Sequence, residues 1–434
     1  MHHIATALNK QLEVDYPHIW RVLSDLGKRI YFPKGILAQS QEAALKATLF
    51  NATIGISTEH KKPMHLPQVQ GMFNDLPPSN IYGYAPAGGR KNLRNLWWEK
   101  IKKTSPMLSD VHCSLPIATS GITHAIALAA QMFVKPGDKV VIPEQNWENY
   151  HLIFEVEREA TIASYPLFNK RNRFNVEGLK RTLLEVLKTQ DQAVVVLNFP
   201  NNPTGYSLTD KEQDEIVHLL TSIASPGKFL MVLCDDAYFG LFFENDLAKQ
   251  SLFAKLANVN QHLLAIKLDG PTKEFFMWGF RLGFITFGYN NAQKGLYDIL
   301  EQKITGLIRA KLSNCSHPAQ SILEKILTDS LHQEEAHRLF LLLQERALKV
   351  KKLLSTGRYA KYFDFYPFNA GYFMCIILKD IPAEKLRLKL LDDYQIGTIS
   401  FGKYDLRIAF SSLDLDDIDE LFEKINLACE ELHS

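Results

Sequence analysis

The stretch LDGPTKEFFMWGFRLGF, Leu268–Phe284, places Lys273 eight residues before Arg281, between two strand-like runs. Two further motifs lie upstream, NFPNNPTG at residues 198–205 and CDDAYFG at residues 234–240. The three segments provide an amine that can form a Schiff base, a fixed cation for a phosphate, a carboxylate that can hold a pyridinium proton and a turn that presents an amide. These are the groups that a pyridoxal-phosphate enzyme needs.

Around these motifs, apolar runs of strand length alternate with segments of helical periodicity. The runs are continuously apolar, as expected for strands that helices cover on both faces. They are KVVIPE (139–144), AVVVLNFP (193–200), FLMVLCDD (229–236), LLAIKLDG (263–270) and RLGFITFG (281–288). The pattern predicts an α/β domain with a mostly parallel sheet at residues 65–335.

The other segments of the 434-residue chain predict a second, smaller unit. A nearly unbroken helical pattern leads out of the first domain, and strand-like runs then alternate with helical segments, which predicts an α+β domain at residues 336–434. Residues 1–64 are too short for a core of their own, so we expect this N-terminal segment to pack with the smaller domain.

The composition is that of an ordinary globular protein, with a net charge of +1, 46% hydrophobic residues and 22% charged residues. Nothing in this balance indicates a nucleic-acid or membrane partner. The N-terminus lacks a long apolar segment after a basic region, and we therefore expect a cytoplasmic protein. The five cysteines are widely scattered without a CxxC pair, so we expect neither a disulfide framework nor a metal site.

Three polar residues mark the ends of strand-like runs: Asn202, Asp235 and Lys273. In open α/β sheets, ligands bind beyond the carboxyl ends of the strands. Alone, each residue has a plain structural explanation, since NNPTG is a good turn anywhere, Asp235 could cap a loop and Lys273 could be a solvated surface residue. Their joint order and spacing favour one shared site.

With these motifs, nearly the whole chain, from NATIG (51–55) to LRIAF (406–410), resembles a fold-type I pyridoxal-phosphate enzyme, specifically a class I aminotransferase of the aspartate/aromatic kind. The resemblance implies a large domain that binds pyridoxal 5'-phosphate and a smaller α+β domain. It also implies an enzyme that takes amino acids and 2-oxo acids as substrates.

The resemblance assigns the catalytic residues to Lys273, Asp235 and Tyr238. Lys273 would form the internal aldimine and then carry a proton between the substrate Cα and the cofactor. Asp235 would pair with the pyridinium nitrogen and keep the ring an electron sink. Asp236 is a rival by chemistry, but successive strand residues face opposite sides, and the family spacing DxAY selects Asp235 with Tyr238.

The resemblance also implies the other contacts to the cofactor. Asn202 and Tyr238 would hydrogen-bond its phenolic oxygen, Arg281 would clamp its phosphate, and Trp147 would stack on its ring. Backbone amides at the start of a predicted helix would meet the phosphate as well. The full set of implied cofactor-binding residues is Gly121, Ile122, Thr123, Trp147, Asn202, Asp235, Tyr238, Lys273, Arg281 and Tyr84.

Other implied residues concern the partner subunit and the substrate. Tyr84 in YGYAPAGG resembles a tyrosine that reaches the phosphate from the partner subunit, which implies a homodimer with shared active sites. Arg407 in DLRIAF resembles the arginine that binds the substrate α-carboxylate, and an arginine inside an apolar strand needs an anionic partner in any case. Gly55, Trp147 and Asn202 complete the implied substrate-binding residues.

Arg309 in IRAKLSN (308–314) resembles an arginine that crosses the dimer interface to bind the distal carboxylate of aspartate or glutamate. The alternative is a helix-face arginine with a surface carboxylate partner. The chain also departs from the family: Gly270 replaces a residue whose hydroxyl touches the phosphate, Tyr150 replaces a histidine common in dicarboxylate enzymes, and Leu312 replaces an aromatic residue. We therefore expect an altered pocket beside Arg309 and no strict specificity for aspartate.

The sequence thus predicts an aminotransferase that moves an amino group between an L-amino acid, aspartate/glutamate or aromatic, and a 2-oxo acid by a ping-pong mechanism. Two alternatives stay open. One is another fold-type I pyridoxal-phosphate reaction, such as that of a β-lyase or decarboxylase, and the other is a catalytically retired binding protein. Arg407 favours transamination because it would fix the carboxylate away from cleavage, and retention of Lys273 argues against a retired protein.

Overall fold

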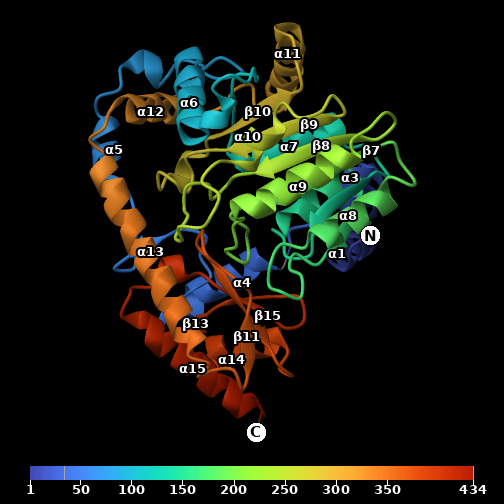
Figure 1. Ribbon diagram of the computed structural model, residues 1–434. Helices are drawn as coiled ribbons and strands as arrows, with labels where there is room; N and C mark the ends of the chain where they lie inside the picture. The colour runs from blue at the N-terminus through green and yellow to red at the C-terminus, as the bar shows by residue number, and fades with distance from the viewer. Residues whose placement is uncertain (34, 434) are drawn as a thin grey trace.

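The computed structural model describes residues 1–33 and 35–433. Its larger unit is built on a seven-stranded sheet with the strand order β4-β10-β9-β8-β7-β5-β6 (Figure 1). Five strands form a parallel group, in the order β9, β8, β7, β5 and β6. Strand β10 is antiparallel to both of its neighbours, β9 and β4. The predicted mostly parallel sheet is confirmed. Its strands are β4 (Ile117–Thr119), β5 (Lys139–Pro143), β6 (Thr161–Tyr165), β7 (Gln192–Asn198), β8 (Phe229–Asp235), β9 (Leu263–Asp269) and β10 (Gly283–Tyr289).

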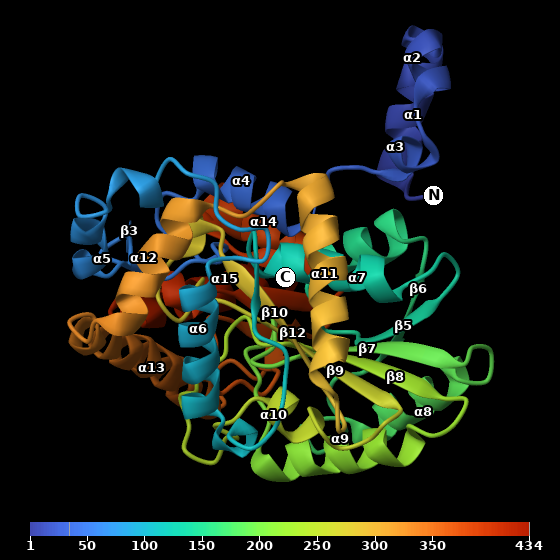
Figure 2. The ribbon, with the colours of Figure 1, turned by 90° about the horizontal axis from the view of Figure 1, so that it is seen from above.

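Helices cover both faces of this sheet, which explains why its central strands are continuously apolar. Every residue of β9 is buried. One apolar cluster joins α7 and the π-helix η3 to one face of the sheet, and another joins α8 and α9 to the other face. Figure 2 shows α8 and α9 lying together along one side. The helices of this unit are α5 (Pro67–Met72), α6 (Lys91–Thr104), α7 (Ile122–Phe133), η3 (His151–Glu157), α8 (Val176–Val186), α9 (Asp210–Ile223), α10 (Leu252–Leu256), α11 (Lys294–Lys311) and α12 (His317–Thr328).

The smaller unit has an antiparallel sheet with the strand order β11-β12-β15-β14. Helices α13, α14 and α15 lie around this sheet at the C-terminal end of the chain (Figure 1). The elements are α13 (Gln333–Ser355), β11 (Phe363–Phe365), β12 (Met374–Leu378), α14 (Ala383–Tyr394), β13 (Ile396–Gly397), β14 (Ile399–Phe401), β15 (Asp405–Ile408) and α15 (Asp417–His433). The domain boundaries after residues 64 and 335 stay a prediction.

The N-terminal segment divides between the two units. Helix α4 packs on β13, β14 and α14, and β1 pairs in parallel with β13 of the smaller unit. Helix α3 instead contacts η3 of the larger unit, where the guanidinium of Arg29 lies 3.0 Å from the carboxylate of Glu159. The expectation that residues 1–64 pack as a whole with the smaller unit is therefore wrong for α3, because Arg29 pairs with Glu159 and also donates a hydrogen bond to the carbonyl of Val156 in η3. Figure 2 shows α1 and α2 projecting from the body of the molecule. The elements are α1 (His3–Asp15), α2 (Pro17–Val22), α3 (Asp25–Arg29), α4 (Ile36–Lys46), β1 (Phe50–Asn51), β2 (Thr58–Glu59) and β3 (Lys62–Pro63).

Over the described residues, no helix combines the length and apolar character needed to cross a membrane. The same part of the chain holds no cluster of three or more histidine, cysteine, aspartate or glutamate side chains arranged to bind a metal ion. The five cysteines are buried as free thiols.

Candidate active site

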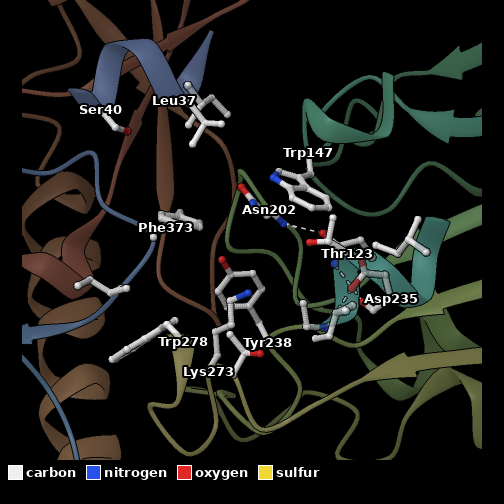
Figure 3. Close-up of a pocket in the computed structure, with 18 of the residues that line it drawn as sticks. Leu37, Ser40, Thr123, Trp147, Asn202, Asp235, Tyr238, Lys273, Trp278 and Phe373 are labelled. Carbon is white, nitrogen blue, oxygen red and sulfur yellow. Dashed lines mark hydrogen bonds between the residues drawn. The ribbon is translucent and has the colours of Figure 1, made fainter. Parts of the chain in front are cut away.

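A cavity of about 420 Å³ lies beyond the carboxyl ends of β7, β8 and β9, where the sequence predicts a site. Both units and the N-terminal helix α4 contribute to its walls (Figure 3). The predicted residues that line it are Gly55, Ile122, Thr123, Trp147, Asn202, Asp235, Tyr238, Lys273, Arg281 and Arg407. The structure thus brings together residues that are as far apart in the sequence as Gly55 and Arg407.

Asp235 ends β8 and is held by two hydrogen bonds. The hydroxyl of Tyr150 donates to its Oδ2 at 2.6 Å, and the backbone N–H of Ala237 donates to its Oδ1 at 3.1 Å. Burial raises the pKa of Asp235, while the hydrogen bonds from Tyr150 and Ala237 and the charge of Lys273 lower it. The neighbouring Asp236 does not line the cavity, because it pairs with Lys267 and accepts a hydrogen bond from Ser251 on the other side of the strand.

Lys273 follows β9 and extends into the cavity beside Tyr238, with its Nζ 4.9 Å from the centre of the tyrosine ring (Figure 3). Burial lowers the pKa of Lys273 to about 8, which the charge of Asp235 opposes and that of Arg281 reinforces. At this pKa an appreciable fraction of the amine is neutral near physiological pH, so it can act as a nucleophile or accept a proton.

The end of the cavity next to α7 is built to meet an anion. Arg281 lies against Gly121, where a Cβ atom would come within 2.4 Å of the arginine Nη2. Gly121 also has a φ of 81°, which disfavours any side chain at this position. Helix α7 begins at Ile122, so its positive end and free backbone N–H groups lie next to the guanidinium.

Gly270 shows why one side chain of the family is missing. A Cβ atom there would lie 2.9 Å from both the Cα of Gly283 and the carbonyl oxygen of Leu282. The backbones of the two neighbouring segments approach too closely for a hydroxyl-bearing side chain. Any contact that such a residue would make to an anion has to come from other groups in this protein.

Arg407 is a buried cation with incomplete hydrogen bonding. Its Nη1 donates to Asn202 Oδ1 at 3.2 Å and its Nη2 donates to the carbonyl of Thr53 at 3.0 Å, while its Nε has no partner in the described structure. The ring of Phe373 lies 4.2 Å from the guanidinium carbon. Burial lowers the pKa of Arg407. An anion that enters the cavity would supply the missing acceptor and balance the buried charge.

Tyr150 does not occupy the place that the sequence suggested. We expected it to alter a substrate pocket beside Arg309, but its side chain is 1% exposed and lies behind Asp235 instead of lining the cavity. Burial raises the pKa of Tyr150 well above its usual value, so the hydroxyl remains a donor to the carboxylate. Its ring also packs edge-on against Trp147, with the ring centres 5.6 Å apart.

Tyr84 and Arg309 lie outside the cavity of their own chain. Tyr84 is 90% exposed. Arg309 is exposed near the end of α11, where its Nη1 donates to Ser313 Oγ at 2.7 Å. Leu312, directly after α11, is exposed as well. The roles predicted for Tyr84 and Arg309 both require a second copy of the chain, so these roles stay predictions.

Several cavity residues belong to no recognisable sequence motif. Ile36, Leu37 and Ser40 come from α4, and Trp278 and Phe373 come from two further segments. In the sequence, apolar residues in an amphipathic helix indicate core packing as readily as a binding site. No local signal distinguishes Leu37 from the other leucines of the N-terminal segment.

The cavity fits pyridoxal 5'-phosphate in its chemistry. Arg281 and the start of α7 suit a phosphate, the amine of Lys273 suits an aldehyde, and the carboxylate of Asp235 suits a protonated ring nitrogen. Trp147 lines the cavity with an aromatic surface for a flat ring. The unsatisfied Nε of Arg407 leaves an anion-binding group free beyond these contacts.

Known proteins with similar sequences are aminotransferases. The family model described as aminotransferase class I and II matches residues 64–425. The chain is 28% identical over 208 residues to a probable N-acetyl-LL-diaminopimelate aminotransferase of Bacillus subtilis, and this matched region covers 48% of each protein. It is 29% identical over 204 residues to aromatic-amino-acid aminotransferase 2 of Thermococcus litoralis, which covers 46% of this chain and 48% of the relative. The chain spans about half the length of the curated relatives that it matches.

Solved structures show the same fold over almost the whole chain. An aminotransferase from Anaerococcus prevotii superimposes with a TM-score of 0.82 at 24% identity, covering 92% of this chain and 98% of that one. A kynurenine aminotransferase from Pyrococcus horikoshii, solved in complex with PMP, superimposes with a TM-score of 0.79 at 16% identity, covering 96% and 98%. The protein has the fold of these enzymes, and it belongs to the class I and II aminotransferases, which use pyridoxal 5'-phosphate as their cofactor.

Proposed function

We propose that the protein is a pyridoxal-phosphate-dependent aminotransferase that moves an amino group between an L-amino acid and a 2-oxo acid by a ping-pong mechanism. The observation that carries the proposal is the convergence of Lys273, Asp235 and Arg407 on one cavity. The bound cofactor supplies an aldehyde that takes up the amino group and a ring that withdraws electrons from the substrate Cα. The residues around the cofactor position the reacting groups, stabilise their charges and transfer protons to and from them.

Lys273 and Asp235 have complementary tasks in this proposal. The Nζ of Lys273, whose pKa burial lowers to about 8, would hold the aldehyde of the cofactor and would accept and return the Cα proton of the substrate. Asp235 would pair with the protonated ring nitrogen of the cofactor. The hydrogen bonds from Tyr150 and Ala237 orient its carboxylate and oppose the rise in pKa that burial causes. Tyr150 is therefore a positioning residue that acts through Asp235.

Other residues hold the cofactor in the same proposal. Arg281 and the backbone N–H groups of Ile122 and Thr123 would bind the phosphate at the start of α7. The N–H of Gly121, which was also predicted to contact the phosphate, donates instead to the carbonyl of Thr119 at 2.9 Å. Tyr238 and Asn202 hydrogen-bond the ring oxygen, which is consistent with their place in the cavity wall. Trp147 packs against the ring and is itself supported by the edge-on contact with Tyr150.

Arg407 binds the substrate α-carboxylate through the donors that its protein contacts leave free. Holding this carboxylate prevents it from aligning for cleavage, which favours transamination over decarboxylation. Asn202 accepts a hydrogen bond from Arg407 and so orients its guanidinium. Gly55, which lines the cavity with no side chain in the way, leaves room for the substrate.

We also propose a homodimer with shared active sites. The exposed Tyr84 would reach the phosphate in the partner's site, and Arg309 would meet the distal carboxylate of aspartate or glutamate there. Aromatic amino acids would use the apolar part of the cavity, where Trp278 and Phe373 lie. A cytoplasmic location is part of the same proposal.

A panel of amino acids and 2-oxo acids tests the proposed reaction. The purified holoprotein, incubated with one labelled amino acid and one 2-oxo acid at a time, should produce the amino acid that corresponds to the 2-oxo acid. We expect transfer from glutamate, from an aromatic amino acid or from both. Release of carbon dioxide, or of ammonia with pyruvate, without any amino-group transfer would favour the decarboxylase or β-lyase alternative.

Replacing Arg309 tests the proposed distal-carboxylate contact. Arg309→Ala should lower kcat/KM for glutamate, because the carboxylate loses a charge-assisted hydrogen bond. The fall should correspond to a loss of about 2 kcal/mol in transition-state stabilisation. The value for phenylalanine should change little, since its side chain has no charge to pair. Equal losses for glutamate and phenylalanine would mean that Arg309 is structural, while the aminotransferase proposal would stand.

A further inference from the structure

Helix α4 is fastened to the smaller unit along its length. The side-chain amide of Gln39 donates to the carbonyl of Ser400 at 3.0 Å, and the backbone N–H of Ser400 donates back to Gln39 Oε1 at 2.8 Å. One turn further, Glu42 pairs with Arg387 at 2.9 Å. Helix α4 therefore belongs mechanically to the smaller unit, although its first residues line the cavity on the side opposite Asp235 (Figure 3).

The N-terminal tip of α4 is held by the larger unit through Glu148. The backbone N–H of Ile36, the first residue of the helix, donates to Glu148 Oε2 at 3.0 Å. The residue before it, Gly35, provides no side-chain cap. Free N–H groups and the positive end of the helix dipole favour a carboxylate at this place. Glu148 thus satisfies a helix end that the local sequence leaves open.

Gly35 shows how closely the two segments meet. A Cβ atom at Gly35 would lie 1.9 Å from Glu148 Oε1, well inside van der Waals contact. A side chain there would have to displace the glutamate. Gly35 and Glu148 therefore form a matched pair, and either member can be altered to break the contact.

The contact between Glu148 and α4 matters because the first turn of α4 forms part of the cavity wall. Ile36 and Leu37 line the cavity together with Phe373 and Arg407. Leu37 keeps 52% of its surface exposed, so it has apolar area left to bury against a substrate side chain. Glu148 directly follows Trp147, which faces the same cavity, so one short segment of the larger unit contacts both the site and its cover.

We propose that Glu148 is a positioning residue that latches the N-terminus of α4 to the larger unit and so holds Ile36 and Leu37 over the substrate end of the cavity. This inference rests on the proposed function only where it concerns substrates. The latch acts on substrate binding and not on the proton transfers, since neither Glu148 nor α4 contacts Lys273 or Asp235 through a hydrogen bond in the described structure.

Two variants break the latch from opposite sides. Glu148→Ala removes the acceptor, and Gly35→Ala pushes the carboxylate away. Each should speed hydrogen–deuterium exchange of the amides at residues 36–40 of the holoprotein by about tenfold, the loss expected for one charge-assisted hydrogen bond. Glu148→Gln retains an oxygen acceptor and should fall between wild type and Glu148→Ala. Glu144→Ala, an exposed residue of the same segment, is the matched control and should leave this exchange unchanged.

The same variants separate substrate binding from chemistry. Glu148→Ala and Gly35→Ala should each raise KM for phenylalanine by about tenfold and leave kcat within about twofold of wild type. In the double variant the second change should add nothing, because both act on one contact. Thermal melts of all variants distinguish this effect from a general loss of folding.

Additive effects of the two substitutions, or wild-type exchange at residues 36–40 in Glu148→Ala, would overturn the latch. A fall in kcat at unchanged KM would also overturn it. If the wild-type protein transfers no amino group, the proposed function fails, and the exchange experiment still decides about the latch because it needs no turnover.

Discussion

Asp235→Asn should leave the protein able to bind pyridoxal 5'-phosphate and remove most of its transaminase activity. The neutral amide cannot hold the proton on the ring nitrogen, so the ring withdraws electrons less strongly. A loss of at least about 2 to 4 kcal/mol in transition-state stabilisation fits the removal of a buried charge-assisted contact. Cofactor absorbance measures binding, and kcat/KM for the best amino acid of the panel measures the loss.

Asp236→Asn is the matched control for this prediction. Asp236 pairs with buried Lys267 away from the cavity, so its neutralisation should mainly lower the free energy of unfolding. Activity must therefore be expressed per folded molecule. Loss of activity in Asp236→Asn with wild-type behaviour in Asp235→Asn would mean that the two carboxylates have been assigned to the wrong sides of β8.

Lys273→Ala should have the largest effect of any single substitution. It removes both the amine that holds the cofactor and the group that carries the Cα proton. General acid–base catalysis alone accounts for about 10²- to 10⁴-fold in rate, or about 3 to 5 kcal/mol. Cofactor binding should weaken much less, since Arg281 and the start of α7 remain. Stopped-flow measurement of the first half-reaction with an amino acid checks this, and a variant that retained wild-type rates would remove Lys273 from the mechanism.

The principal side chains of the site could be predicted because they end strands. Asp235 and Lys273 follow apolar runs whose continuous burial identifies central strands, and such strands deliver their last residues to one edge of the sheet. The alternation of side chains along a strand separated Asp235 from Asp236, and the structure places the two on opposite sides as expected.

The predicted location of the Tyr150 side chain was wrong for a physical reason. Its position in the sequence shows which residues surround it along the chain but not which way its side chain points. Its hydroxyl donates a hydrogen bond to the buried carboxylate of Asp235, and this acceptor offsets the cost of burying a tyrosine hydroxyl. The side chain therefore points away from the substrate side of the cavity. Only the tertiary contact with Asp235 reveals this.

The cover formed by α4 could not be predicted either. Ile36 and Leu37 reach the cavity because Gln39 and Glu42 bind a surface more than 340 residues later in the chain (Arg387 and Ser400), and no local pattern encodes such a pairing. Arg309 is a different case, because its predicted partner would be in another subunit. Neither the motif nor the structure of a single chain is sufficient to establish the role of such a residue.

The attachment site of the cofactor decides whether Lys273 has the role proposed for it. Borohydride reduction of the yellow holoprotein, followed by proteolysis and mass spectrometry, should place the cofactor covalently on the peptide that contains Lys273. Lys267, a buried lysine six residues earlier that pairs with Asp236, is the internal control and should remain unlabelled. A label on Lys267, or a purified protein that binds no cofactor, would contradict the role proposed for Lys273.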